Sequence, residues 1–226
     1  MTGTVLVTGG SSGLGAAVVA AVADAGGRPL VLDRQPPQRE VPHVLVDLAD
    51  GRAAERAVVR LADEAGGLDA VVTAAGIDSC GQLADVPAED WERVVRVNLL
   101  GTAAVVRAAL PYLARSSGRV VTVASTLGLR ALSDATAYCA SKFGVVGFTR
   151  ALAAETAGRV GVTLLIPGGM RTAFFDDRTE QYKPPADAKL NRPEDVARAV
   201  LMALSQPAGC ELRELVITPA VEPSWP

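Results

Sequence analysis

Short apolar runs alternate with longer segments of helical spacing along most of the chain. The apolar runs predict β-strands at residues 4–8, 29–33, 43–46, 69–73, 119–124, 161–166 and 214–218. Helical patterns occupy most of the intervals, including two long helices expected at 98–115 and 138–157. Such alternation is typical of an α/β fold with a doubly wound parallel sheet of the Rossmann type. In that sheet the carboxyl ends of the strands form a ligand crevice at the topological switch point.

One connection is too short for a crossover helix. Nine residues separate Asp33 from His43, and three of them are prolines, at positions 36, 37 and 42. A parallel crossover ordinarily takes about ten residues or more. We therefore expect an extended linker between the second and third strands, in place of a full helix.

A glycine-rich segment follows the first predicted strand. Thr8-Gly9-Gly10-Ser11-Ser12-Gly13-Leu14-Gly15 leads from this strand into an alanine-rich helical stretch. A bare backbone turn at a helix N-terminus can bind a pyrophosphate, because unpaired N–H groups face the anion. The spacing Gly-x-x-x-Gly-x-Gly differs from the dinucleotide fingerprint Gly-x-Gly-x-x-Gly, and a flexible turn without a ligand is the alternative.

Tyr138 and Lys142 stand four residues apart in a predicted helix, and Ser125 ends the apolar run that precedes them. Positions i and i+4 share one face of a helix. A phenol serves as an acid or base near neutral pH only when a neighbouring cation lowers its pKa from about 10. Lys142 would supply that cation. Because such pairs also occur by chance on solvated helices, the glycine turn is needed to support this interpretation.

Together these motifs resemble the short-chain dehydrogenase/reductase family over nearly the whole chain. They match at Thr8-Gly9-x-x-x-Gly13-x-Gly15, Asn98, Ser125, Tyr138-x-x-x-Lys142 and Pro167-Gly168-x-x-x-Thr172. The resemblance implies hydride transfer between a nicotinamide cofactor and a secondary alcohol or ketone.

The resemblance assigns a role to each of four catalytic residues. Tyr138 would be the general acid/base, and Ser125 the donor that orients the substrate oxygen. Lys142 would lower the tyrosine pKa and bind the ribose, and Asn98 would hold a water that links the lysine to solvent. A strand-end cap is the alternative for Ser125, and an asparagine bonded locally to the backbone is the alternative for Asn98.

The resemblance also implies a site for the dinucleotide. Its expected residues are Gly9, Ser11, Ser12, Gly13, Leu14, Gly15, Asp33, Arg34, Asp47, Leu48, Ala74, Ala75, Gly76, Tyr138, Lys142, Pro167, Gly168, Met170 and Thr172. Asp33 ends the second strand, eighteen residues after Gly15, where a carboxylate accepts from ribose hydroxyls and repels a 2′-phosphate. We therefore expect NAD in preference to NADP, with Arg34 as a guanidinium that could still hold a phosphate.

Three further segments bear on this site. Asp47 matches the family aspartate that contacts the adenine amino group, and a helix N-cap is the alternative. Thr73-Ala74-Ala75-Gly76 stands where relatives usually show Asn-Asn-Ala-Gly, so both amides are missing. The loop from Pro167 to Thr172 resembles the segment that fixes the nicotinamide carboxamide, and a plain turn is the alternative.

Residues 173–190 are rich in charge, contain Pro184 and Pro185, and are expected to form a mobile lid over the substrate. Phe174, Phe175 and Tyr182 would give this lid an apolar underside. The expected substrate contacts are Ser125, Leu127, Tyr138, Phe174 and Phe175. Ile77, Leu129 and Met170 would extend a partly hydrophobic pocket, and core packing is the alternative for all of these apolar residues.

Residues 219–226 predict an extended tail with an exposed Trp225 that could dock on another subunit. Family members commonly pair through the two long helices, so a homodimer or homotetramer is expected. The length and ending loosely resemble relatives that act on 3-hydroxy acids.

Composition limits the alternatives. The 226 residues, 49% hydrophobic and 21% charged, fit one domain over 1–226. A net charge of -3 gives no electrostatic reason to expect nucleic acid or an anionic membrane as a partner. The start of the chain lacks a secretory pattern, so a cytoplasmic location is expected, and the apolar stretch from Leu14 to Ala23 is too short to span a bilayer.

Cysteine and histidine usage excludes two kinds of site. The three cysteines, at 80, 139 and 210, are widely spaced and are interpreted as reduced thiols. His43 is the only histidine, so histidine-based triads and multi-histidine metal sites are excluded and no metal is expected.

A dinucleotide-binding sensor or scaffold without turnover is the second interpretation of the same fold. A binder of this kind has no need of a phenol paired with an ammonium. The complete set of Asn98, Ser125, Tyr138 and Lys142 therefore favours an enzyme.

Overall fold

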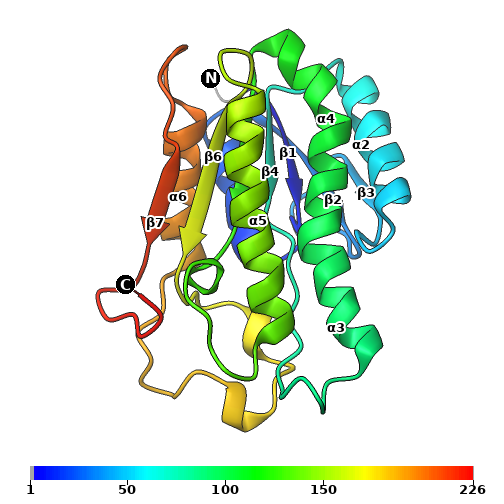
Figure 1. Cartoon of the computed structure of the whole chain (residues 1–226). Helices are drawn as coiled ribbons and strands as arrows, with labels where there is room; N and C mark the ends of the chain where they lie inside the picture. The colour runs from blue at the N-terminus through cyan, green and yellow to red at the C-terminus, as the bar shows by residue number, and fades with distance from the viewer. Residues whose placement is uncertain (1–2, 226) are drawn as a thin grey trace.

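Seven parallel strands form one sheet, in the order β3-β2-β1-β4-β5-β6-β7, in the computed structural model, which describes residues 3–225 (Figure 1). The strands are β1 Thr4–Thr8, β2 Arg28–Asp33, β3 His43–Leu45, β4 Ala70–Thr73, β5 Arg119–Val123, β6 Gly161–Pro167 and β7 Glu214–Ile217. Each lies within one residue of its predicted bounds. The strand order runs outward from β1 in one direction through β2 and β3 and from β4 in the other, so β1 and β4 flank the topological switch point, where a crevice opens at their carboxyl ends. The predicted doubly wound fold is confirmed.

Helices cover both faces of the sheet (Figure 1). They are α1 Gly13–Asp24, α2 Gly51–Ala65, α3 Ala88–Val95, α4 Thr102–Ser116, α5 Thr136–Glu155 and α6 Pro193–Leu204. Successive strand residues point to opposite faces. In β1, Leu6 packs in the core cluster shared with α2 and α4, whereas Val5 and Val7 pack in the cluster shared with α1 and α6. Burial on both sides explains why the strands are apolar at nearly every position.

The helix predicted at 98–115 is the second half of a longer rod. A π-helical segment, Arg96–Gly101, joins α3 to α4 without a break. Among the described residues, this rod from Ala88 to Ser116 is the one helix long and apolar enough to cross a membrane by length and composition. Half of its most apolar window is buried inside the protein, and the core helix of a globular protein meets the same criterion.

Irregular segments gather at the carboxyl end of the sheet. Residues 34–42, between β2 and β3, form bends and contain no helix. Residues 173–190 contain only two single-turn 3-10 helices, Ala173–Phe175 and Glu180–Tyr182. Figure 1 shows this segment below the strand ends, close to the tail that follows β7. The crevice is therefore enclosed by loops, on a rigid sheet.

Candidate active site

A cavity of about 540 Å³ opens at the carboxyl ends of β1, β2, β4, β5 and β6. This volume lies within the range of small-molecule sites in proteins. The glycine turn, the ends of β2 and β4, the residues after β5, the start of α5 and the loop after β6 all contribute to its wall. The predicted motifs therefore meet in one cleft.

The glycine turn forms a backbone cradle. Gly9 has a φ of +69°, and a Cβ placed on it would lie 2.8 Å from Ala75 Cα. A Cβ on Gly15 would lie 2.0 Å from the carbonyl oxygen of Gly9. Helix α1 begins at Gly13, and the side chain of its N-cap, Ser12, makes no capping hydrogen bond. The N–H groups of the first turn thus face the cleft without competition from a side chain, which fits an anionic pyrophosphate.

Asp33 is fixed at the end of β2 by backbone donors. Its Oδ2 accepts from Ser11 N at 2.9 Å, and its Oδ1 accepts from Gln35 N at 3.2 Å. Ser11 is buried, and its hydroxyl donates to the Gln35 carbonyl at 2.5 Å. Asp33 and Arg34 line the cleft, whereas Ser11 stands behind the wall. The structure thus places Ser11 as support for Asp33, and its predicted contact with the dinucleotide stays a prediction.

Asp47 also lines the cleft, but it does not cap a helix. The N-cap of α2 is Asp50, which accepts from Arg52 N and Ala53 N, so the N-cap alternative for Asp47 is wrong. Asp47 Oδ1 accepts from Ala49 N at 2.9 Å, and Oδ2 pairs with Arg93 at 2.6 Å. Burial raises the pKa of Asp47, but the bonds from Arg93 and Ala49 outweigh it, and the pKa lies below its ordinary value.

Arg93 was not among the predicted residues, although it lines the cleft. No local motif marks it, since it lies in α3, far from the glycine turn in sequence. The segment Thr73-Ala74-Ala75-Gly76 is held by a different bond, from Ala75 N to Thr8 Oγ1 at 3.2 Å. Within the described part of the chain, the buried Thr73 hydroxyl has no hydrogen-bond partner.

Lys142 and Asn98 meet beside Gly76. A Cβ on Gly76 would lie 3.6 Å from both Lys142 Nζ and Asn98 Oδ1. Lys142 is 4% exposed and donates to the carbonyl oxygen of Val123 at 2.9 Å. Burial lowers the pKa of Lys142 to about 8, against the opposing charge of Asp78. At neutral pH this lysine is therefore still mostly protonated, but it is close to titrating.

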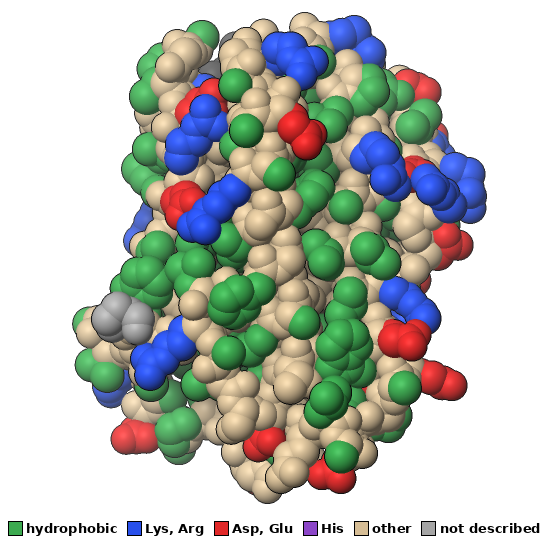
Figure 2. All heavy atoms as spheres, viewed as in Figure 1, with side chains coloured by type: hydrophobic (Ala, Val, Ile, Leu, Met, Phe, Trp, Pro, Cys, Tyr) green, Lys and Arg blue, Asp and Glu red, His purple; other side chains and the backbone are tan. Residues whose placement is uncertain are grey.

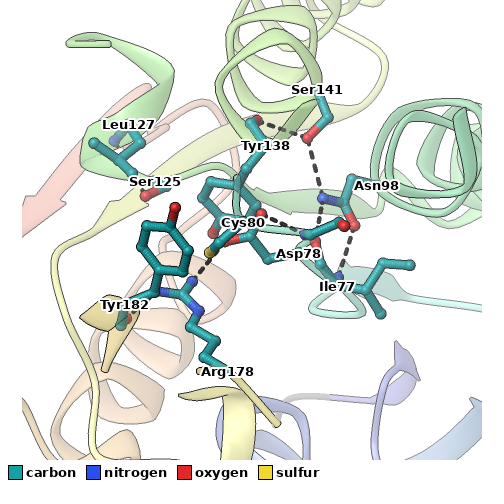
Figure 3. A network of polar contacts seen from close by, with 11 residues as sticks. Ile77, Asp78, Cys80, Asn98, Ser125, Leu127, Tyr138, Ser141, Arg178 and Tyr182 are labelled. Atoms are coloured by element: carbon teal, nitrogen blue, oxygen red, sulfur yellow. Dashed lines mark hydrogen bonds and ion pairs between the residues drawn. The ribbon is translucent and has the colours of Figure 1, made fainter. Parts of the chain in front are cut away.

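The Asn98 carboxamide is hydrogen-bonded to the loop after β4 and not, as the alternative interpretation had it, to its own neighbouring backbone. Its Oδ1 accepts from Ile77 N and its Nδ2 donates to Ile77 O, both at 2.9 Å. Nδ2 also donates to Ser141 Oγ at 3.0 Å (Figure 3). The π-helical segment places this residue where the rod passes that loop. Both N–H donors are used, and one acceptor position on Oδ1 is left for a water.

Ser125 and Tyr138 both line the cleft, and the Ser125 hydroxyl lies close enough to the phenol to act on its pKa. Ser125 Oγ also accepts from Leu127 N at 3.1 Å, as the N-cap of a 3-10 turn at Thr126–Gly128. The capping alternative for Ser125 is therefore confirmed, and its role as donor to the substrate oxygen stays a prediction. The Tyr138 ring lies 5.6 Å from Lys142 Nζ, measured to its centroid.

The pKa of Tyr138 departs from the expected direction. Burial raises the pKa of the phenol above its ordinary value, and the hydrogen bond from Ser125 and the charge of Arg178 oppose this only in part. Lys142, whose ammonium donates to the Val123 carbonyl, is not among the groups that set this pKa in the structure, so the expectation that it lowers the pKa stays a prediction. The hydroxyl is therefore a neutral proton donor at neutral pH.

The loop after β6 closes the cleft opposite Ser125. Pro167, Gly168, Met170 and Thr172 all line it, as predicted from the sequence. Thr172 Oγ1 accepts from Phe174 N at 3.3 Å and caps the first turn of the segment 173–190. A Cβ on Gly13 would lie 3.3 Å from Thr172 Cγ2, so this loop reaches the glycine turn.

Aromatic rings form the wall beside Tyr138. The rings of Tyr138 and Phe174 lie 5.7 Å apart, and those of Phe174 and Phe175 lie 5.4 Å apart, centroid to centroid. Leu127, Ile77, Met170 and the unpredicted Leu132 also line the cleft. Leu129 packs against a small core cluster, so for this residue the core-packing alternative is correct. Tyr182 is not among the residues that line the cleft.

A buried ion pair ties the segment 173–190 to the loop after β4 (Figure 3). Arg178 and Asp78 are 2.6 Å apart, with side chains 19% and 6% exposed. The Arg178 guanidinium also lies 5.1 Å from the Phe174 ring centroid and 4.7 Å from that of Phe175. The Cys80 thiol donates to Asp78 at 3.3 Å, and burial, reinforced by that carboxylate, raises the pKa of Cys80 to about 12. No sequence signal marked this pair.

The C-terminal tail lies against its own chain. Glu222, Pro223 and Ser224 line the cleft. The sequence suggested docking on another subunit, yet these residues contact the loop after β6 and the segment after Ser125 of the same chain.

Comparisons with known proteins agree with this site. A family model described as short chain dehydrogenase matches residues 3–183. A glycine betaine reductase of Emericella nidulans is 33% identical over 96% of this chain, which spans 19% of that protein's length. An uncharacterized oxidoreductase of Staphylococcus aureus is 32% identical, over 95% of this chain and 96% of its own. A short chain dehydrogenase from Burkholderia cenocepacia in complex with NADP is 27% identical, with a TM-score of 0.85, and covers 96% of this chain and 97% of that one.

The match to the family model extends over most of the chain and includes the glycine turn, Ser125, Tyr138, Lys142 and Thr172. The first relative is much longer than this chain, so its activity as a whole protein does not transfer. Sequence and structure agree on the family, and the chain belongs to the short-chain dehydrogenase family of oxidoreductases, whose members bind a nicotinamide dinucleotide.

Proposed function

We propose that this chain transfers a hydride between a nicotinamide dinucleotide and a secondary alcohol or ketone, with Tyr138 as general acid/base. The observation that carries the proposal is the cluster of Ser125, Tyr138 and Lys142, which all line the cleft, with Lys142 Nζ 5.6 Å from the Tyr138 ring centroid. It stands in the same cleft as a glycine cradle that any Cβ at position 9 or 15 would fill. A cleft that only bound the dinucleotide would not require a serine hydroxyl beside a phenol that is backed by an ammonium.

The bound nicotinamide supplies the hydride chemistry, and the residues of this chain handle the proton. In reduction, Ser125 holds the carbonyl oxygen and Tyr138 donates a proton to it. The raised pKa of Tyr138 suits this direction, because the phenol starts protonated. Lys142 keeps a positive charge behind the ring, and Asn98 holds the loop at Ile77 in place. In oxidation the proton moves in the opposite direction.

NAD is the proposed preferred cofactor. Asp33 Oδ1 and Oδ2 are held by two backbone N–H groups at the edge of the cleft, so the carboxylate cannot turn away from a ribose. A 2′-phosphate there would meet a fixed negative charge. Arg34 lines the same edge and provides the competing attraction.

The substrate we propose is neutral and partly apolar around its carbonyl. Phe174, Phe175, Leu127 and Leu132 give the wall beside Tyr138 an apolar character. The charge of Arg178 is already paired with Asp78 and is therefore not free to recruit an anion. Residues 173–190 act as the lid over this pocket within a single domain.

A homodimer or homotetramer is also proposed. Figure 2 shows hydrophobic side chains gathered over α5 and the rod formed by α3 and α4. Leu100 is 55% exposed and Phe143 is 44% exposed on these helices. Apolar side chains grouped on one face are suited to a symmetric interface between copies.

The test is a panel of secondary alcohols and ketones, followed by nicotinamide absorbance with NAD and with NADP. Turnover of neutral, apolar members is the expected result. Tight dinucleotide binding without turnover of any member would instead support a non-catalytic sensor.

A further inference from the structure

The C-terminal tail completes the backbone bonding of the loop after β6. Gly168 N donates to the carbonyl oxygen of Ile217, the last residue of β7, at 2.9 Å. The next donor, Gly169 N, donates to Glu222 Oε2, also at 2.9 Å. Two successive N–H groups of this loop are therefore satisfied by the last ten residues of the chain. A hydrogen bond to a carboxylate is stronger than one to a backbone carbonyl, so the bond from Gly169 to Glu222 is the stronger of the two.

The other oxygen of Glu222 leads to the catalytic serine segment. Oε1 accepts from Ser224 N at 3.1 Å and from Ser224 Oγ at 2.6 Å. Ser224 Oγ lies 2.6 Å from the hydroxyl of Thr126, the residue after Ser125. Because the carboxylate only accepts, the Ser224 hydroxyl donates to Glu222 and the Thr126 hydroxyl donates to Ser224. The Pro223 carbonyl accepts from Arg130 at 3.3 Å.

Gly168 packs closely against the Glu222 carboxylate. A Cβ on Gly168 would lie 2.2 Å from Glu222 Oε2, so any side chain there would require the Glu222 carboxylate to move away from the loop. Glu222, Pro223 and Ser224 all line the cleft. The tail is therefore a wall of the cleft, built from the same chain as the Tyr138 site.

We propose that Glu222 is a positioning residue for the loop 167–172, and that the tail of the same subunit holds this loop in the shape that binds the nicotinamide end of the dinucleotide. The inference rests on the proposed function for what this end of the cleft binds. Among the described residues, the hydrogen bonds of Glu222 go to Gly169 and Ser224, and none goes to the glycine turn or to Asp33 at the other end. Loss of the tail should thus weaken binding of the intact dinucleotide and spare binding of its ADP-ribose part.

The experiment measures dissociation constants of NAD and of ADP-ribose by titration calorimetry. Glu222→Gln keeps the size of the side chain but offers one acceptor oxygen, so either Gly169 N or the Ser224 donors lose a partner. We expect NAD to bind about fivefold to tenfold more weakly to this variant, and ADP-ribose to bind within about twofold of wild type. A chain that ends after Pro219 should lose more affinity for NAD than Glu222→Gln does, and its affinity for ADP-ribose should again stay close to that of wild type.

Glu211→Gln is the matched control. Glu211 also accepts from a backbone N–H, that of Val162 at 3.4 Å, and pairs with Arg213, but it lies outside the cleft. Its substitution should leave both dissociation constants unchanged.

Three results overturn the proposal. They are an unchanged NAD affinity in Glu222→Gln, an equal loss for NAD and ADP-ribose, and a wild-type chain that binds neither. If the shortened chain unfolds, Glu222→Gln decides alone. All of these measurements are binding constants. If the wild-type chain binds NAD but turns over no substrate, the proposed catalytic function is wrong, whereas the effect of Glu222→Gln on NAD and ADP-ribose binding can still be measured.

Discussion

The two ends of the cleft are built in different ways. At the glycine-turn end, backbone atoms form the surface, and Asp33 and Asp47 are each held by an N–H two residues along the chain. At the Tyr138 end, side chains form the surface, and the contacts that hold it join distant parts of the chain. Asp78 and Arg178 are 100 positions apart, and Thr126 and Ser224 are 98 apart.

This difference separates recognition of the cofactor from recognition of the substrate. A backbone cradle with no room for a Cβ at Gly9 or Gly15 tolerates few changes and suits a ligand that does not vary. Side chains on loops vary without disturbing the sheet, and they suit a substrate that differs among members of one fold. Substitutions at the two ends should therefore have separable effects.

The largest effect is expected at the buried ion pair. Asp78→Asn leaves the Arg178 charge without its partner, and Arg178 Nε is already without a partner in the described residues. We expect the free energy of unfolding to fall by about 3 kcal/mol, since breaking a buried pair strands a charge. Urea denaturation measures this.

An exposed pair supplies the control. Asp24→Asn removes the partner of Arg39, where the side chains are 69% and 49% exposed. Its cost should be less than about 0.5 kcal/mol. Equal losses in the two variants would show that the Asp78–Arg178 pair is no more than a surface contact.

Next in size is a change confined to the cradle. Gly15→Ala places a Cβ 2.0 Å from the Gly9 carbonyl, so the turn must shift. We expect NAD and ADP-ribose both to bind about a hundredfold more weakly, while the fold persists. Gly147→Ala, on α5 with no atom within 4 Å of the added Cβ, is the matched control for titration calorimetry. If Gly15→Ala bound NAD with wild-type affinity, the glycine turn would not be the site that holds the pyrophosphate.

A smaller effect concerns the choice of cofactor. Asp33→Ala removes the fixed carboxylate and leaves Arg34 at the same edge. We expect the ratio of NADP to NAD affinity to rise about tenfold. A ratio that stays constant, or favours NAD further, would contradict the proposed role of Asp33.

The smallest effect is a shift in titration. Because burial raises the pKa of Tyr138, its phenol should remain protonated at pH 10, where an ordinary tyrosine is about half ionised. Carbon NMR of labelled tyrosine in the dinucleotide-free chain reports this, with Tyr138→Phe used to assign the signal. Ionisation of Tyr138 below pH 9 would show that Lys142 dominates after all.

The sequence predicted the cofactor end and the architecture better than the substrate end. Strand bounds, Gly9, Gly15, Asp33 and Lys142 follow from local periodicity, glycine geometry and spacing, all of which are short-range properties. The raised pKa of Tyr138 was missed, because it depends on how the whole fold buries one hydroxyl.

Other features had no local signal at all. Arg93 pairs with Asp47 only because the fold brings α3 beside the loop after β3, and Asp78 meets Arg178 only because residues 173–190 fold across the loop after β4. The return of Glu222 to Gly169 likewise depends on where β7 ends. These contacts are set by topology, which a pattern along the chain does not contain.

The most direct test of the account is the rate of Tyr138→Phe with the best substrate of the panel, measured together with its NAD dissociation constant. We expect kcat to fall by roughly 10²- to 10⁴-fold, the usual contribution of a general acid, and the dissociation constant to stay within about twofold of wild type. A variant that turns over its substrate at the wild-type rate would contradict it.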